Sequence, residues 1–158
     1  MTAVLAHALA VIRRDVYGIE CDPGAAASAA LFHDATEIFT GDMPTPIKYL
    51  NAELTAAYKS AEREAESRLL AHLPTELSGA YAPLVHGGDE AVRDLVRAAD
   101  KLCAYVKCLE EERAGNHEFR LAREQTLTKL HALQMPEVEY FMEHFIKPFE
   151  LTIDEINT

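Results

Sequence analysis

The sequence contains no tryptophan, and its 158 residues include only seven glycines, seven prolines and three cysteines. So little glycine and proline, beside 49% hydrophobic residues, argues against collagen-like and disordered chains. Three cysteines cannot all pair, and none stands in a CxxC motif, so neither a disulfide framework nor a zinc knuckle is indicated. We therefore expect one folded domain over residues 1–158, working in a reducing cytoplasm.

Positive charge is also scarce. Fifteen Lys and Arg residues stand against 26 Asp and Glu residues, which gives a net charge of −11. A broad basic face for a nucleic-acid polymer or an anionic membrane is therefore not expected, and an anionic ligand would need a local positive charge. The apolar stretch from Met1 to Ile12 is too short to span a bilayer. We interpret it as the first helix of the domain.

No run of alternating β-branched residues indicates a strand, so the sequence predicts an all-α fold. Pro at the start of a helix, Asp as a cap and the three-and-four spacing of apolar residues set the expected boundaries. The expected helices cover residues 2 to about 16, 23–39, about 47–72, 75–83, 90 to about 115, about 117–133 and 136–145. A rigid turn is expected over residues 40–46, and residues 151–156 add one further turn.

Polar groups in apolar surroundings are the informative residues, because an unpaired buried charge is costly. His33 and Asp34 directly follow an apolar stretch, and on one continuous helix Glu37 would share a face with His33. Asp100 interrupts the apolar stripe of the 90–115 helix, so it needs a cation. That cation is either Lys101, Lys107 or Arg97, or a metal ion. A mixed nitrogen and oxygen donor set suits one divalent transition ion such as Mn, Co, Fe or Zn.

Two stretches carry a resemblance to a known family. LFHDATEIFTGDMPTPIKYLN (residues 31–51) and VRAADKLCAYVKCLEEERAGNHEF (residues 96–119) resemble the bacterial 5′-deoxynucleotidases of the HD-domain superfamily, and the likeness runs from about residue 3 to residue 156. It implies an HD-domain helical bundle and a metal-dependent phosphomonoesterase. Such an enzyme hydrolyses 2′-deoxynucleoside 5′-monophosphates to deoxynucleosides and phosphate, prefers them to ribonucleotides, and usually acts as a homodimer.

The resemblance also implies roles for individual residues. The metal ligands would be the doublet His33 and Asp34 together with the distant Asp100, and Glu37 would transfer a proton. The loop that contacts the deoxyribose and phosphate side of the substrate would consist of Asp42, Met43, Pro44 and Thr45, with Asp42 as the sugar reader. The placement of polar groups in apolar surroundings singles out the same four residues: His33, Asp34, Glu37 and Asp100.

The sequence departs from the family pattern at one end. The family has a further histidine ligand shortly before the position that matches Met1, and an Arg-Trp pair that handles phosphate and sugar; this sequence has neither. We therefore expect weaker metal binding and weak or absent hydrolysis, with His7 packed in the core rather than replacing the ligand. Two alternatives stay open. One is a non-catalytic HD module that binds nucleotide or dimerises, and the other is an HD phosphohydrolase for a nucleoside triphosphate or alarmone.

Overall fold

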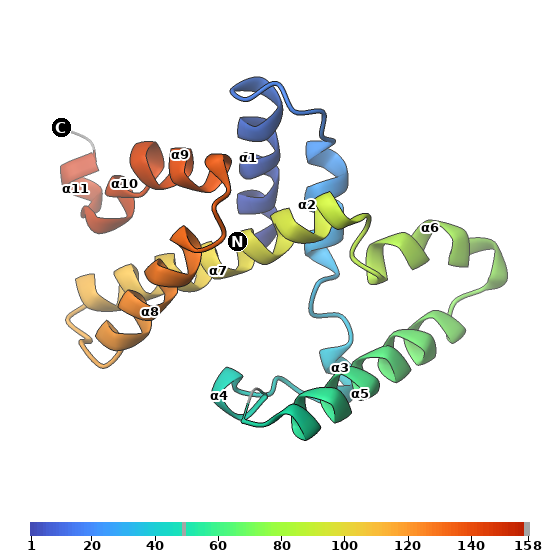
Figure 1. Cartoon of the computed structure of the whole chain (residues 1–158). Helices are drawn as coiled ribbons and strands as arrows, with labels where there is room; N and C mark the ends of the chain where they lie inside the picture. Colours follow the sequence, from blue (N-terminus) through green and yellow to red (C-terminus); the bar gives the residue numbers. More distant parts are fainter. Residues whose placement is uncertain (49, 157–158) are drawn as a thin grey trace.

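The structure, a computed structural model, describes residues 1–48 and 50–156, apart from the side chains of residues 45, 46 and 153. Every regular element in this part of the chain is a helix, so the all-α prediction is confirmed (Figure 1). The helices are α1 (Thr2–Asp15), α2 (Pro23–Leu31), α3 (Glu37–Thr40), α4 (Thr45–Lys48), α5 (Ala52–Ala71), α6 (Thr75–Val85), α7 (Glu90–Arg113), α8 (Arg120–His131), α9 (Pro136–Phe145), α10 (Lys147–Glu150) and α11 (Ile153–Ile156). Among the described residues, none of these helices is long and apolar enough to cross a membrane.

Helix α7 is the centre of the body. Asp89 caps it, as predicted, by accepting a hydrogen bond from the backbone N–H of Val92 at 2.8 Å. Leu95, Leu102 and Val106 are fully buried along its inner face. Helices α1, α2, α8 and α10 pack directly against α7, and α9 packs against α1 (Figure 1). The apolar periodicity of the sequence therefore located the core correctly.

A charged pair is buried inside this body. Glu137, at the start of α9, is fully buried, and its Oε1 accepts a hydrogen bond from Arg13 Nε at 2.7 Å. Arg13 also donates to the backbone carbonyl of Ala91 at 3.5 Å. Within the described residues, Glu137 Oε2 has no hydrogen-bond partner. One arginine thus ties α1 to α9 and reaches the first turn of α7.

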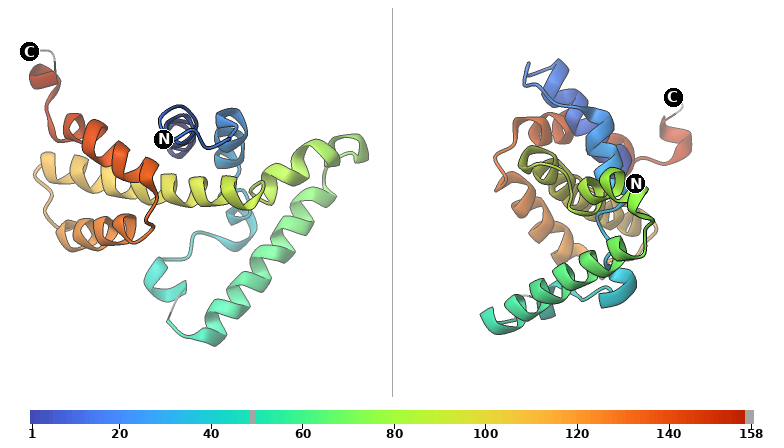
Figure 2. Two further views of the ribbon diagram at one scale, coloured as in Figure 1. Left: turned by 45° about the horizontal axis from the view of Figure 1, so that its top comes forward. Right: turned by 90° about the vertical axis from the view of Figure 1, so that its right-hand side faces the viewer.

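Helices α3 to α6 form an arm that stands away from this body (Figures 1 and 2). Helix α5 packs against α3, α4 and α6, and α6 in turn packs against α2. The expected helix over residues 75–83 is confirmed as α6, which continues to Val85. The arm therefore meets the body mainly where α6 approaches α2.

Two of the expected helices in this region are wrong. The helix over residues 23–39 is broken, because α2 ends at Leu31 and α3 begins only at Glu37. The Nδ1 atom of His33 lies 2.8 Å from the Ala30 carbonyl, which the N–H of Asp34 would bond in a continuous helix. The helix over residues 47–72 begins later, at Ala52, because the Asn51 side chain caps it by accepting from the N–H of Leu54 at 2.8 Å. Part of the turn over residues 40–46 also joins α4.

The expectation that His7 packs in the core is also wrong. The buried stripe of α1 consists of residues 5, 6, 9, 10 and 12, and position 7 points away from it. His7 is accordingly exposed, and it lines a shallow apolar surface pocket with Ala3, Val4 and Ala27. It is not the packed core histidine that the sequence suggested.

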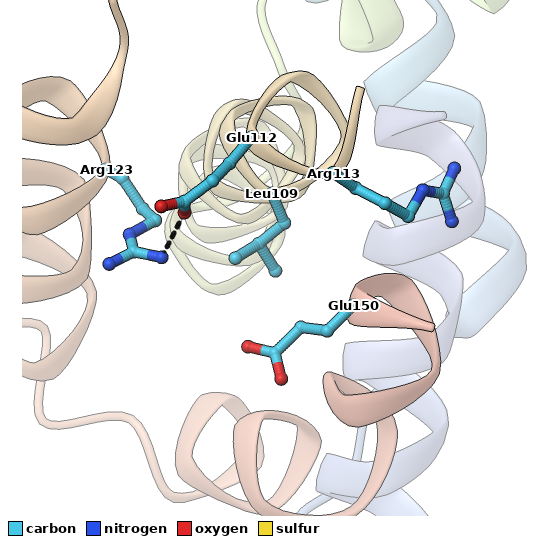
Figure 3. A pocket seen from close by; sticks show the side chains of 5 residues that line it. All are labelled: Leu109, Glu112, Arg113, Arg123 and Glu150. Atoms are coloured by element: carbon cyan, nitrogen blue, oxygen red, sulfur yellow. Dashed lines mark hydrogen bonds and ion pairs between the residues drawn. The ribbon is translucent and has the colours of Figure 1, made fainter. Parts of the chain in front are cut away.

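The far end of α7 carries a second pocket (Figure 3). It is lined by Leu109, Glu112, Arg113, Arg123 and Glu150. Arg123 forms an ion pair with Glu112, and Arg113 donates to the backbone carbonyl of Leu151 at 2.7 Å. The two arginines that line the pocket therefore hold α8 and the segment after α10 against α7, which is a structural role.

Candidate metal centre

His33 lies in the turn after α2 and faces α7. The carbonyl of Ala30 can only accept, so its 2.8 Å contact with Nδ1 places a proton on Nδ1. The other ring nitrogen, Nε2, lies 2.9 Å from Asp34 Oδ2 and 3.8 Å from Asp100 Oδ1. The structure therefore brings together the three residues that the sequence suggested as ligands, although they come from positions 66 residues apart in the chain.

The donor chemistry of these three residues fits a divalent ion. Two ligands at about 2.1 Å from one ion and at cis angles lie roughly 3 to 3.5 Å apart, close to the two distances measured from Nε2. A ligating histidine also commonly donates its other N–H to a carbonyl or carboxylate, as His33 does to Ala30. In the described part of the chain, however, no three His, Cys, Asp or Glu side chains form a closed cluster ready to hold an ion. The arrangement consists of two pairs that share His33.

The site is open to solvent on its acidic side. The side chains of Asp34 and Asp100 are 58% and 59% exposed, while that of His33 is 22% exposed. The Asp100 carboxylate raises the pKa of His33, and His33 in turn holds the pKa of Asp100 below its usual value. Burial raises the pKa of Asp34, and the charges of Asp100 and Asp42 act in the same direction. Without an ion, the two carboxylates therefore favour the protonated form of the imidazole more than water does.

The structure excludes one of the cations considered for Asp100. Asp100 Oδ1 lies 3.8 Å from His33 Nε2, whereas Arg97 forms its ion pair with Asp94 at 3.2 Å. Lys101 and Lys107 act on Asp100 only through their charges. Of the alternatives, the salt bridge between Asp100 and Arg97 is therefore not formed.

Glu37 stands at the first position of α3, half-buried. It does not share a helix with His33, but its backbone N–H donates to the carbonyl of Asp34 at 3.0 Å, which keeps the two residues adjacent. Burial raises the pKa of the Glu37 carboxyl, and the nearby charges of Asp34 and Asp42 raise it further. A raised carboxyl pKa is suited to proton transfer near neutral pH.

The loop after α3 borders the same site. Gly41 turns the chain with φ +70°, a conformation that favours glycine, and Asp42 follows it with an exposed side chain whose charge reaches Asp34 and Glu37. Met43 and Pro44 continue the loop. The side chain of Thr45, the fourth expected substrate contact, lies outside the described part of the structure.

Lys48, at the end of α4, brings positive charge to this acidic corner. Its charge opposes the rise in the pKa of both Asp34 and Glu37. Its Nζ lies 2.7 Å from Glu62 Oε1 and 4.4 Å from the centre of the Tyr58 ring. Lys48 is thus a local cation of the kind that an anionic ligand of this acidic chain requires.

Comparison with known proteins decides the family. Residues 1–149 match the family described as 5′-deoxynucleotidase YfbR-like. The chain belongs to this family. A 5′-deoxynucleotidase of Vibrio parahaemolyticus is 45% identical over 98% of this chain and 81% of its own length, and one of Shewanella oneidensis is 46% identical over 98% and 80%. The 5′-deoxynucleotidase YfbR of Shigella flexneri is 44% identical over 98% and 79%.

A solved structure agrees on the fold. The crystal structure of an HD-domain phosphohydrolase from Listeria innocua superposes with a TM-score of 0.75, covering 99% of this chain and 77% of that one at 22% identity. The HD-domain helical fold expected from the resemblance is therefore confirmed.

Two features of this YfbR-like site could not be read from the sequence. One is the Ala30 carbonyl that orients His33, because a backbone carbonyl in a run of alanines gives no signal in the sequence. Tyr58 approaches the loop from α5, and only its helical spacing from Thr55 and Glu62 hints that these three residues share a face. The loop that they contact becomes visible only in the folded chain.

Proposed function

We propose that this chain removes phosphate from 2′-deoxynucleoside 5′-monophosphates with one divalent transition ion, Mn, Co, Fe or Zn, held by His33, Asp34 and Asp100. The observation that carries the proposal is the position of His33 Nε2, which lies 2.9 Å and 3.8 Å from the two carboxylates while Nδ1 is fixed by Ala30. The names of its YfbR-like relatives supply the substrate class.

In the proposed hydrolysis, different residues of the chain would have different roles. When bound, the ion would supply Lewis acidity and a water molecule of lowered pKa. Glu37 would accept a proton from the attacking water or donate one to the leaving 5′ oxygen, for which its raised pKa suits it. Lys48 would offset the negative charge of the phosphate beside three carboxylates.

Substrate choice would be made in the loop over residues 42–45. Asp42 would contact the deoxyribose, with Met43, Pro44 and Thr45 completing a close fit on the sugar and phosphate side. A ribonucleotide brings one additional hydroxyl, which a close-fitting site leaves crowded or without a partner. The preference for deoxyribonucleotides would therefore depend on where this loop stands relative to His33.

Two acids of α7 make a matched test of the metal site. Asp100 contacts His33, whereas Asp94 lies six residues earlier on the same helix and pairs with Arg97. Asp100→Ala should abolish Mn²⁺ binding in calorimetry and phosphate release from dAMP, while Asp94→Ala should preserve both. Equal Mn²⁺ affinity in the two variants would contradict the assignment. The unchanged chain, assayed on dAMP and AMP with Mn²⁺ or Co²⁺, tests whether hydrolysis is as weak as the sequence suggests.

The same proposal covers the protein's assembly and location. We infer a homodimer, as the family resemblance implies, working in the cytoplasm, as the three unpaired cysteines indicate. Large apolar side chains are available for such contacts, because Leu31, Ile38 and Leu50 are 72%, 77% and 72% exposed. Light scattering coupled to gel filtration should give about twice the 17.5 kDa chain mass. A monomer at micromolar concentration would contradict this part of the proposal.

A further inference from the structure

One face of α5 holds the loop beside the metal centre at both of its ends. Thr55, Tyr58 and Glu62 are three and four residues apart and therefore share this face. The Tyr58 hydroxyl donates to the carbonyl of Gly41 at 3.1 Å. At the other end, the Thr55 hydroxyl lies 3.0 Å from the carbonyl of Lys48 and 2.9 Å from that of Asn51, so the two carbonyls share its one proton, and Lys48 Nζ donates to Glu62 at 2.7 Å.

Tyr58 is the more informative of these contacts. It is one of two buried residues on α5, whose other residues are exposed or half-buried, and 7% of its surface is accessible. Its hydroxyl bonds the carbonyl of Gly41, where the chain leaves α3 with φ +70°. Fixing that carbonyl fixes the plane of the Gly41–Asp42 peptide bond, and hence the direction in which Asp42 leaves the turn.

Packing alone does not fix this loop. A pocket of about 410 Å³, open to solvent, lies between the loop and α5; it is lined by Phe39, Thr40, Met43, Tyr58, Ala61, Glu64, Ala65 and Arg68. Because no side chain fills this space, the backbone of the loop has room to shift there. The hydrogen bonds from α5 therefore add directional restraints at both ends of the segment between Gly41 and Lys48, beside the local contact of the neighbouring Thr40 hydroxyl, which lies 3.2 Å from the same Gly41 carbonyl.

We propose that Tyr58 is a positioning residue for substrate selection, acting through the Gly41 carbonyl to set Asp42 against the His33 centre. This inference rests on the proposed function. Thr55 and Glu62 do the same for Lys48 at the opposite end of the loop. Without the Tyr58 hydroxyl, Asp42 no longer meets the sugar in one fixed geometry. Ion binding is unaffected, because His33, Asp34 and Asp100 make no contact with these α5 side chains through the hydrogen bonds and ion pairs described.

Tyr58→Phe tests this, because it keeps the buried ring and removes only the hydroxyl. We expect the Kd for dAMP, measured by calorimetry with saturating Mn²⁺, to rise roughly 3- to 10-fold, as for one lost hydrogen bond. The preference for dAMP over AMP should fall, and the affinity for Mn²⁺ alone should stay unchanged. Tyr17→Phe is the matched control, since Tyr17 packs edge-on against Tyr140 far from the arm and should change none of these values.

Two further measurements separate the possible failures. Thr55→Val should weaken dAMP binding in the same direction from the other end of the loop, and hydrogen exchange should show faster amide exchange over residues 41–43 in Tyr58→Phe. Wild-type dAMP affinity and selectivity in Tyr58→Phe, or an equal loss in Tyr17→Phe, would overturn the inference. If the unchanged chain binds dAMP but releases no phosphate, the proposed hydrolysis fails, and the dAMP to AMP ratio still decides the role of Tyr58. If it binds neither nucleotide, both proposals fail.

Discussion

Replacing Arg13 by methionine should destabilise the whole body of the protein. The substitution keeps much of the side chain's volume and removes the partner of Glu137, whose side chain is 1% exposed. Leaving one member of a buried ion pair without its partner costs about 3–5 kcal/mol, because the remaining charge can neither reach water nor be compensated. Glu137 already has one carboxylate oxygen without a partner, so no alternative donor is at hand among the described residues.

The expected shift is large enough to measure directly. For a domain of this size each kcal/mol lowers Tm by about 2–4 °C, so Arg13→Met should lower it by roughly 6–20 °C. Thermal unfolding followed by far-ultraviolet circular dichroism gives Tm, and urea titration gives the free energy of unfolding. Because the protein is all helical, one signal reports on the whole fold.

Neighbouring Arg14 provides the control. It pairs with Asp15 on the surface, where the two side chains are 47% and 55% exposed, so Arg14→Met should leave Tm nearly unchanged. The double variant Arg13→Met/Glu137→Leu should regain much of the loss, since it removes the stranded carboxylate. If Arg13→Met unfolds at the same temperature as Arg14→Met, the pair does not hold α1 to α9 in the way described.

Two further predictions concern the candidate metal centre. Glu37→Gln should lower kcat on dAMP by about 10²- to 10⁴-fold while Mn²⁺ binding stays intact, and a variant with full activity would remove Glu37 from proton transfer. For pH, the pKa of His33 is raised above 6.5, so its protonation stabilises the metal-free fold fully below pH 6.5 and this contribution disappears as the pH rises through the raised value. Mn²⁺ affinity should increase over the same interval, because the ion binds the neutral ring, and calorimetry at several pH values that shows a flat affinity would contradict this.

The sequence predicted the body better than the arm, for physical reasons. Helix α7 is indicated in the sequence by its cap at Asp89 and by apolar residues at regular spacing, and α9 begins at Pro136 as expected. The break in the predicted 23–39 helix has no such signal, because neither glycine nor proline marks it. It arises from the ring of His33 bonding Ala30 and from contacts across to α7, which are tertiary interactions.

The candidate site shows the same division. Spacing and residue type were enough to single out His33, Asp34 and Asp100, and the structure brings them within reach of one another. Their role as ligands stays a prediction. The expectation that Glu37 shares a helix with His33 was wrong, although the two are linked through Asp34. The anchoring by Tyr58 could not be predicted, because no local pattern states which loop an α5 side chain will meet.

The separation of body and arm has a consequence for how this scaffold can change. His33, after α2, and Asp100 of α7 face each other in the body, whereas the loop proposed to contact the substrate belongs to the arm of α3 to α6, which meets the body mainly through α6. If the proposed roles hold, substitutions within residues 41–62 would change which ester is recognised and leave the proposed metal ligands in place. An engineer seeking activity on a different nucleotide would vary Asp42 and its supports on α5 first. Residues 22–34 and 89–113 would be kept fixed, since they build the part of the molecule that any phosphate ester would share.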